Sequence, residues 1–159
     1  MHYEKTTNHP VGENQLLDTL TNPDFIVEHA KFYKALDCRV VEVSRSTASL
    51  VQKVIKREIS KTSGEEEEVV ETREWNLARR RCEWTRTPPK GAPPGMVKIS
   101  GAYQITGDSQ SSRLISEGDI DIRIPIMGKK LAQKIIDKIV NDDGKFERFV
   151  NDYLKERSG

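Results

Sequence analysis

The hydrophobic pattern changes period along the chain. Residues 1–7 alternate weakly, as a first strand would, and helical spacing follows in two stretches, one through Leu16, Leu17 and Leu20 and one from Asp24 to about Leu36. From Cys38 onward the period becomes two. This pattern predicts six further strands, over 38–44, 48–59, 67–77, 80–86, 96–106 and 112–126. The segments between them are short and have turn chemistry, so we expect hairpins and an antiparallel meander.

The last third of the chain combines a strand with a long helical pattern. Isoleucines alternate with charged residues up to Pro125, which cannot donate to a ladder, and Gly128 permits a sharp bend. Beyond the bend, apolar residues recur at three- and four-residue spacings as far as Leu154. The spacing predicts one long C-terminal helix that ends near Arg157 and lies against the sheet. The predicted class is therefore α+β.

Composition narrows the picture only a little. A chain of 159 residues is most simply one domain over 1–159, and 35% hydrophobic with 32% charged residues requires each element to concentrate its apolar side chains on one face. The net charge of +1 argues against nucleic-acid binding by bulk electrostatics. No apolar run is long enough for stable membrane insertion. Two cysteines and no secretory signal indicate a cytoplasmic protein.

Several chemistries have no support in the sequence. The three histidines and two cysteines show no metal-ligand spacing, so we expect no metal. A phosphate-binding glycine loop and a nucleophile elbow are also missing, and we expect no cofactor. The proline-rich segment 87–95 predicts a stiff loop; it is read as an ordinary hairpin loop, with a lid or a protein-docking strip at 88–95 as alternatives.

The predicted order of elements resembles the helix-grip fold of the START-like (SRPBCC) superfamily, which includes lipid-transfer START domains, aromatase/cyclases and pollen-allergen-like carriers. The resemblance covers essentially the whole chain. Its most specific parts are Asn22-Pro23-Asp24-Phe25, Gly101-Ala102-Tyr103 and the stretch from Ile124 to Leu131, and these look most like an uncharacterised bacterial branch of the superfamily. The resemblance implies a seven-stranded curved antiparallel sheet, two short helices after the first strand, and a long C-terminal helix over an apolar cavity.

Period-two alternation assigns strand residues to the inner face, and helical spacing supplies a roof. The expected ligand-binding residues are His29, Phe32, Arg73, Trp75, Trp84, Ile99, Tyr103, Ile120, Ile122, Leu131, Ile135 and Ile139. The same reading also places Ile55, Val97 and Ile124 inside. The two tryptophans are equally well explained as ordinary core residues.

One strand contains a conflict. In 67–77, the alternation that carries Trp75 inward also carries Glu71 and Arg73. A bulge resets the alternation, the two charges pair, or they face a polar part of the cavity, where an arginine would bind a carboxylate or phosphate. Arg57 shares this ambiguity. Similarly, His29 is either a rim-of-core residue or a polar anchor, and the Tyr103 hydroxyl is a candidate ligand contact or proton donor.

The function predicted from these features is the binding or carriage of an apolar small molecule or lipid, without catalysis. Two alternatives stay open. One is an aromatase/cyclase-like enzyme that uses the same cavity, and the other is a protein-interaction module whose cavity is plugged by its own side chains.

Overall fold

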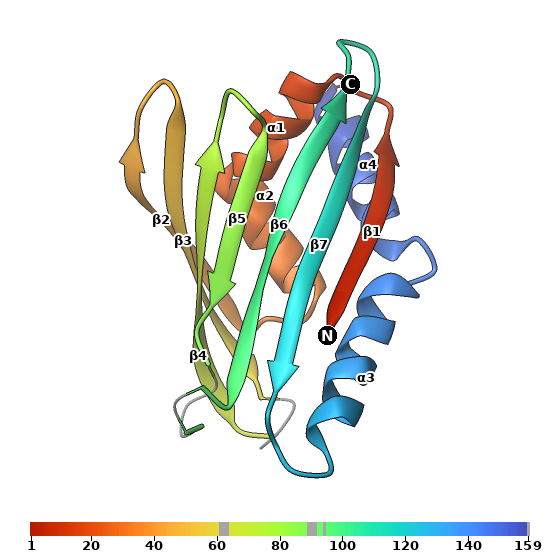
Figure 1. Cartoon of the computed structure of the whole chain (residues 1–159). Helices are drawn as coiled ribbons and strands as arrows, with labels where there is room; N and C mark the ends of the chain where they lie inside the picture. The colour runs from red at the N-terminus through yellow and green to blue at the C-terminus, as the bar shows by residue number, and fades with distance from the viewer. Residues whose placement is uncertain (61–63, 89–91, 94, 159) are drawn as a thin grey trace.

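A computed structural model of the chain describes residues 1–60, 64–88, 92–93 and 95–158. It has the predicted order of strands and helices (Figure 1): β1(His2–His9), α1(Glu13–Thr21), α2(Pro23–Phe32), β2(Asp37–Arg45), β3(Ser49–Ile59), β4(Glu66–Asn76), β5(Arg81–Arg86), β6(Val97–Gly107), β7(Ser112–Ile122), α3(Gly128–Val140) and α4(Lys145–Ser158). The α+β class and the two helices after the first strand are confirmed. Part of the proline-rich loop, residues 89–91 and 94, lies outside the described residues.

The seven strands form one antiparallel sheet in the order β1-β7-β6-β5-β4-β3-β2. Strands β2 to β7 follow the chain as a meander, and β1 closes the far edge by pairing with β7 over its whole length. The chain must therefore cross the sheet between β1 and β2, and α1 and α2 make this crossing over one face (Figure 1). We call that face, toward which the sheet curves, the inner face.

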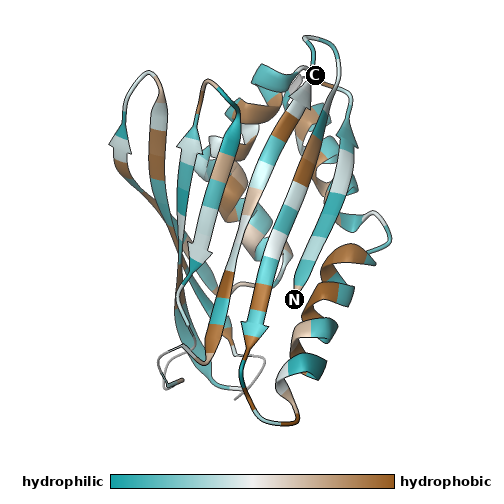
Figure 2. Ribbon diagram, viewed as in Figure 1, coloured by the Kyte–Doolittle hydropathy of each residue, from teal (hydrophilic) through white to brown (hydrophobic). Residues whose placement is uncertain are grey.

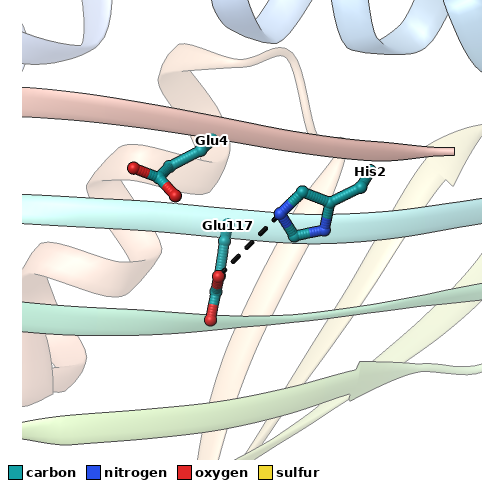
Figure 3. Close-up of side chains that lie close together, drawn as sticks. All are labelled: His2, Glu4 and Glu117. Carbon is teal, nitrogen blue, oxygen red and sulfur yellow. Dashed lines mark ion pairs between the residues drawn. The ribbon is translucent and has the colours of Figure 1, made fainter.

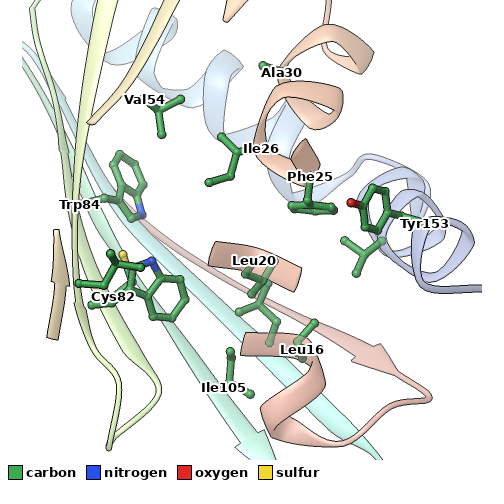
Figure 4. Close-up of a cluster of buried hydrophobic side chains, with 14 of the residues drawn as sticks. Leu16, Leu20, Phe25, Ile26, Ala30, Val54, Cys82, Trp84, Ile105 and Tyr153 are labelled. Carbon is green, nitrogen blue, oxygen red and sulfur yellow. The ribbon is translucent and has the colours of Figure 1, made fainter. Parts of the chain in front are cut away.

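The main core lies between the inner face and the helices. Figure 4 shows Leu16 and Leu20 of α1, and Phe25 of α2, between the β5 side chains and Tyr153 of α4. Asn22 makes the second helix possible, because its side chain accepts a hydrogen bond from the Asp24 N–H at 2.9 Å and so caps a helix that opens with proline. This helix ends at Phe32, earlier than predicted, and Lys34 follows with a positive φ of 68°.

The C-terminal helix differs from the prediction, because it is two helices. The break has a local cause: Asp143 and Gly144 are left-handed, and the Asp142 carboxylate caps α4 by accepting the Phe146 N–H at 3.0 Å. Lys5 of β1 fixes the break from outside. Its ammonium pairs with Asp142 at 2.6 Å and donates to the last-turn carbonyl of Ile139 at 2.9 Å.

Strand β7 is shorter than the predicted 112–126, because its pairing ends at Ile122. The Arg123 N–H still donates to the Met96 carbonyl at 2.7 Å, and then the chain turns into α3. Gly128 is buried in this turn so closely that a Cβ there would collide with the Ile122 carbonyl oxygen. Ile124, expected inside, therefore lies in the turn and is only partly buried.

Candidate functional site

Strand β3 presents to the inner face the set of residues that the sequence reading assigned to the outside. Leu50, Gln52 and Val54 are buried, whereas Arg57 is exposed and Ile55 is only half-buried. The predicted inward position of Ile55 was therefore wrong, and Arg57, which the sequence left open, lies on the outside. The prediction failed because the outer positions of this strand carry more apolar residues than the inner ones, so counting apolar residues selects the wrong face.

The inner positions of β3 and β4 carry charge instead. Glu71 and Arg73 face inward without a bulge, since the β3–β4 register is continuous, and both are buried. They pair along the strand, with Arg73 Nε donating to Glu71 Oε2 at 2.6 Å. Of the three possibilities left open by the sequence, the structure has a buried ion pair on the inner face. Because both residues lie on β4, the ion pair does not join elements that are distant in the sequence.

The pKa values of the two paired residues are shifted in opposite directions. Burial alone would raise the pKa of Glu71, but the charges of Arg73 and Lys56 lower it to about 2. Burial opposes the charge of Arg73 as well, yet Glu71 keeps the pKa of the guanidinium above its ordinary value. Both groups are therefore ionised at neutral pH. Because Lys56 adds a second positive charge to this one carboxylate, the group of Lys56, Glu71 and Arg73 has a net positive charge, and we call it the charged cluster.

Three neighbouring inner residues are polar, and two of them have a buried polar atom without a protein partner. Gln52, Arg73 and Trp84 lie side by side across β3, β4 and β5 in one row of the sheet. Trp84 Nε1 and Gln52 Oε1 are buried with no hydrogen bond, and within the described residues only Nε of Arg73 donates one. The amide orientation of Gln52 is fixed, because its Nε2 donates to the Thr21 carbonyl at 2.8 Å. We call these three residues the polar row.

The position of Trp84 depends on a glycine. Gly101 lies directly opposite Trp84 on β6, and a Cβ at Gly101 would come within 2.6 Å of the indole ring. The ring therefore lies over the glycine, and it also approaches Tyr103, whose ring centroid is 6.2 Å away. The Gly101-Ala102-Tyr103 motif thus supplies the space that holds the tryptophan at this point of the inner face.

His29 and Tyr103 border the charged cluster from two sides. His29 of α2 is surrounded by aromatic rings, including Tyr33 at 4.9 Å and Phe146 at 5.3 Å, and its Nε2 is buried with no partner. Burial, reinforced by the charges of Arg73 and Lys56, lowers the pKa of His29 to about 3. The Arg73 guanidinium lies 5.9 Å from the Tyr103 ring centroid, and burial and Glu71 raise the pKa of this tyrosine. His29 is therefore neutral at physiological pH.

The apolar wall of the site comes from β6, β7 and α3. Ile120 is buried against Ala132 and Ile136 of α3, and the predicted residues Ile99, Ile122, Ile135 and Ile139 pack around this cluster while staying partly exposed. Leu131 is half-buried on the same flank of the helix. The predicted stripe at 131, 135 and 139 therefore lies at the edge of the contact between α3 and the sheet. The residues one position later, 132 and 136, fill that contact.

Two of the predicted ligand residues lie elsewhere. Trp75 is buried in the main core, although its Nε1 also has no partner. Phe32 is 40% exposed and stacks on Phe149 at 4.6 Å, where both line a surface recess of about 350 Å³ between α2 and α4. A second recess, of about 550 Å³, is lined by His9 and other residues near the β6–β7 turn. Neither recess is lined by the polar row.

A histidine and two glutamates gather on the opposite, outer face of β1 and β7. Figure 3 shows His2, Glu4 and Glu117, whose potential ligand atoms lie within 4.8 Å of one another. Glu117 also accepts a hydrogen bond from Arg81 at 3.2 Å, and His2 lies 3.0 Å from the Asp119 carboxylate. His2 and Glu117 thus have partners within the protein, and we assign them to a surface ion-pair network.

The sequence reading missed the inner charges of β3 and β5. Lys56 and Glu58 face the inner side of β3, and Glu58 forms an ion pair with Arg86 of β5. The available signal was charge complementarity between strands. Placing Lys56 and Glu58 on the same face as Glu71 and Arg73 brings a positive charge toward Glu71 and pairs Glu58 with Arg86, whereas the chosen alternation put Arg57 on that face instead.

Comparison with known proteins supports the fold. The structure is similar to the Zhui aromatase/cyclase from Streptomyces sp. R1128, with a TM-score of 0.67, 13% identity, and coverage of 100% of this chain and 96% of the other. The protein TTHA0849 from Thermus thermophilus matches with a TM-score of 0.65, 12% identity and 100% of both chains. A START superfamily protein from Mycobacterium smegmatis matches with a TM-score of 0.54, 12% identity, and 98% and 95% coverage. No curated protein matches the sequence.

These likenesses, together with the meander sheet, the crossing helices and the C-terminal helices on the inner face, show that the chain has the helix-grip fold, which the START superfamily structure shares. Within this class a family profile matches residues 2–154. The chain belongs to the DUF2505 family, described as a protein of unknown function. The predicted resemblance to the superfamily is confirmed. Among the described helices, none is long and apolar enough to cross a membrane.

Proposed function

We propose that the inner face binds an amphipathic small molecule that has an apolar body and an acidic head group. The N–H donors of Arg73 and Trp84, with the positive charge of Lys56, receive the head group. The isoleucines of β6, β7 and the flank of α3 contact the body. Binding, rather than chemistry on the ligand, is the function of this arrangement.

The polar row is the observation that carries the proposal. Buried polar atoms in folded proteins almost always have a partner, and leaving one without a partner costs about 1–3 kcal/mol. Here Gln52 and Trp84 each have a buried polar atom without a partner, and they lie on either side of Arg73 in one row of the sheet. Two of the three offer N–H donors, and Lys56 gives the neighbouring charged cluster a net positive charge. A ligand carboxylate would satisfy the donors and balance the charge.

The apolar wall supplies the remaining affinity. Ile99 and Ile122 on the sheet, and Leu131, Ile135 and Ile139 on α3, are partly exposed although they lie on the inner side. Covering apolar surface contributes roughly 25 cal/mol per Å², before the cost of ordering the ligand. Selectivity between ligands of equal length would therefore come from the head group.

The proposal is tested by titrating the detergent-free protein with a saturated fatty acid and with the alcohol of the same chain length, using tryptophan fluorescence and native mass spectrometry. Lys56→Gln removes an inward charge, and Lys53→Gln removes an exposed charge from the same strand, so the two variants form a matched pair. We expect Lys56→Gln to weaken binding of the acid about tenfold, as the loss of a charge-assisted hydrogen bond does.

The comparison has clear outcomes. Tighter binding of the acid than of the alcohol, with a loss confined to Lys56→Gln, supports the proposal. If neither compound binds, or if both lysine variants bind the acid as the wild type does, the head-group site is not at the charged cluster and the proposal is refuted.

The aromatase/cyclase alternative needs two groups that exchange protons within hydrogen-bond reach. Tyr103 and His29 make no hydrogen bond to each other, and His29 is packed among aromatic rings. This arrangement supports a binding role over proton transfer. Turnover of a cyclisable chain that is lost in Tyr103→Phe would favour the enzyme instead.

A further inference from the structure

The turn between β7 and α3 exposes two apolar residues at its tip. Ile126 is 94% exposed and Met127 is 57% exposed, although both are large hydrophobic side chains. In Figure 1 the turn lies at the end of the molecule away from the C-terminus, beyond the end of β7 and the first turn of α3. The Ile126 side chain therefore projects almost wholly into solvent, and Met127 is more than half exposed beside it.

The backbone at Ile126 is unfavourable for its residue type. Its φ is +71°, a left-handed conformation that asparagine and glycine adopt readily and that is a genuine outlier for a β-branched residue. An exposed isoleucine in this conformation costs stability and returns no packing. Such a residue at a turn is a reason to look for a function outside the fold.

Basic residues surround the tip. Arg123 precedes it, and its side chain is 68% exposed. Lys129 and Lys130 follow it, and the exposed side of α3 continues with Lys134 and Lys138. The acidic residues nearby are few and already engaged: Asp121 pairs with Arg123 at 3.1 Å, and Asp137 accepts a hydrogen bond from Gln133 at 2.8 Å. The exposed side of α3 therefore has a net positive charge.

We propose that this tip and the exposed side of α3 form a docking surface for an anionic lipid bilayer. Ile126 and Met127 enter the headgroup region, while Lys129 and Lys130 contact anionic lipids. An apolar tip inside a basic surface is complementary to such a bilayer, which has an apolar region behind its anionic headgroups. Docking does not depend on what the inner face binds.

The test is co-sedimentation with vesicles of phosphatidylcholine alone and with about one-third phosphatidylserine, a mixture that gives a negative surface potential. Ile126→Asn removes the apolar tip and relieves the left-handed strain, so this variant should fold at least as well as the wild type. The matched control is Val43→Thr, at a valine of β2 that is 53% exposed on another part of the surface. The paired variant Lys129→Gln/Lys130→Gln tests the charges.

We expect binding to the anionic vesicles only, with weaker partitioning at higher salt. Ile126→Asn should weaken it about tenfold, and the double lysine variant about thirtyfold, as the loss of two basic groups near an anionic surface should. Val43→Thr should partition as the wild type does. Circular dichroism melting of each variant confirms that the fold is kept.

The proposal is overturned if the wild type does not sediment with anionic vesicles, or if Ile126→Asn and the wild type partition equally. Equal binding of a DNA duplex and of vesicles, unaffected by Ile126→Asn, would assign the basic surface to general electrostatics and also overturn it. Because fatty-acid binding is measured without vesicles, failure of docking and failure of the proposed ligand site are separate results.

Discussion

Lowering the pH from 7.5 to 5 should destabilise this protein through His29. The ring is buried beside Arg73 and Lys56, and its pKa falls from 6.5 to about 3. Because the unfolded chain takes up a proton near pH 6.5 and the folded protein does not until about pH 3, the free energy of unfolding falls as the pH is lowered through this window. The stabilisation is complete above about pH 6.5, and the loss levels off below about pH 3.

The size of this destabilisation follows from how far the pH falls below 6.5, the ordinary pKa of His29. Each pKa unit corresponds to about 1.4 kcal/mol, so stopping at pH 5 costs about 2 kcal/mol. His9 acts in the same direction, because burial lowers its pKa as well, although its hydrogen bond to Asn151 partly opposes this effect. The carboxylates with lowered pKa, such as Glu71, lose their contribution only at lower pH.

Urea unfolding at a series of pH values between 5 and 7.5 measures the effect, with His29→Gln as the variant. Below about pH 6.5, where the unfolded chain binds the extra proton, the wild-type slope should exceed that of His29→Gln by about one proton, or roughly 1.4 kcal/mol per pH unit. The NMR signal of the His29 ring should also stay constant over this range. Equal slopes, or a His29 signal that titrates near pH 6.5, would refute the electrostatic account of the charged cluster.

Three substitutions test the fold around the site. Glu71→Gln leaves the Arg73 charge buried without its partner and should lower the free energy of unfolding by about 3–5 kcal/mol, whereas the double variant Glu71→Leu/Arg73→Met should recover most of it in the same urea measurement. Gly101→Ala forces a methyl group against Trp84 and should cost about 1–3 kcal/mol while changing the tryptophan emission; an unchanged spectrum would contradict the glycine argument. Lys5→Met removes the ion pair at the α3–α4 break and should cost about 1–3 kcal/mol, with faster amide exchange confined to that break.

Most of the architecture could be predicted from local sequence chemistry. Turn residues between alternating segments gave the meander, and Asn22 before Pro23 gave the helix start. The break between α3 and α4 was missed, because the apolar spacing continues across it and predicts one helix. Its cause is a left-handed Asp143–Gly144 pair and a lysine from β1, and only the second of these is invisible without the tertiary structure.

The site was only partly predictable. Arg73, Trp84, His29 and Tyr103 were named from alternation and residue type, and the structure places all four around the charged cluster. The inner residues of β3 were missed. Alternation rules assume that the apolar set faces the core, and this assumption fails where a buried surface is polar. Figure 2 shows hydrophilic residues interspersed with hydrophobic ones along the strands.

That failure indicates what the inner face is for. Val51, Ile55 and Ile59 lie on the outer side of β3, while Lys56 lies on the inner side between Cys38 and Val69 of the neighbouring strands. A strand selected for stability alone would have the opposite arrangement. Lys56→Leu should therefore leave the melting temperature unchanged or higher, because it adds apolar burial, and should weaken binding of the fatty acid. A lower melting temperature with unchanged binding would instead make Lys56 a structural residue that supports Glu71.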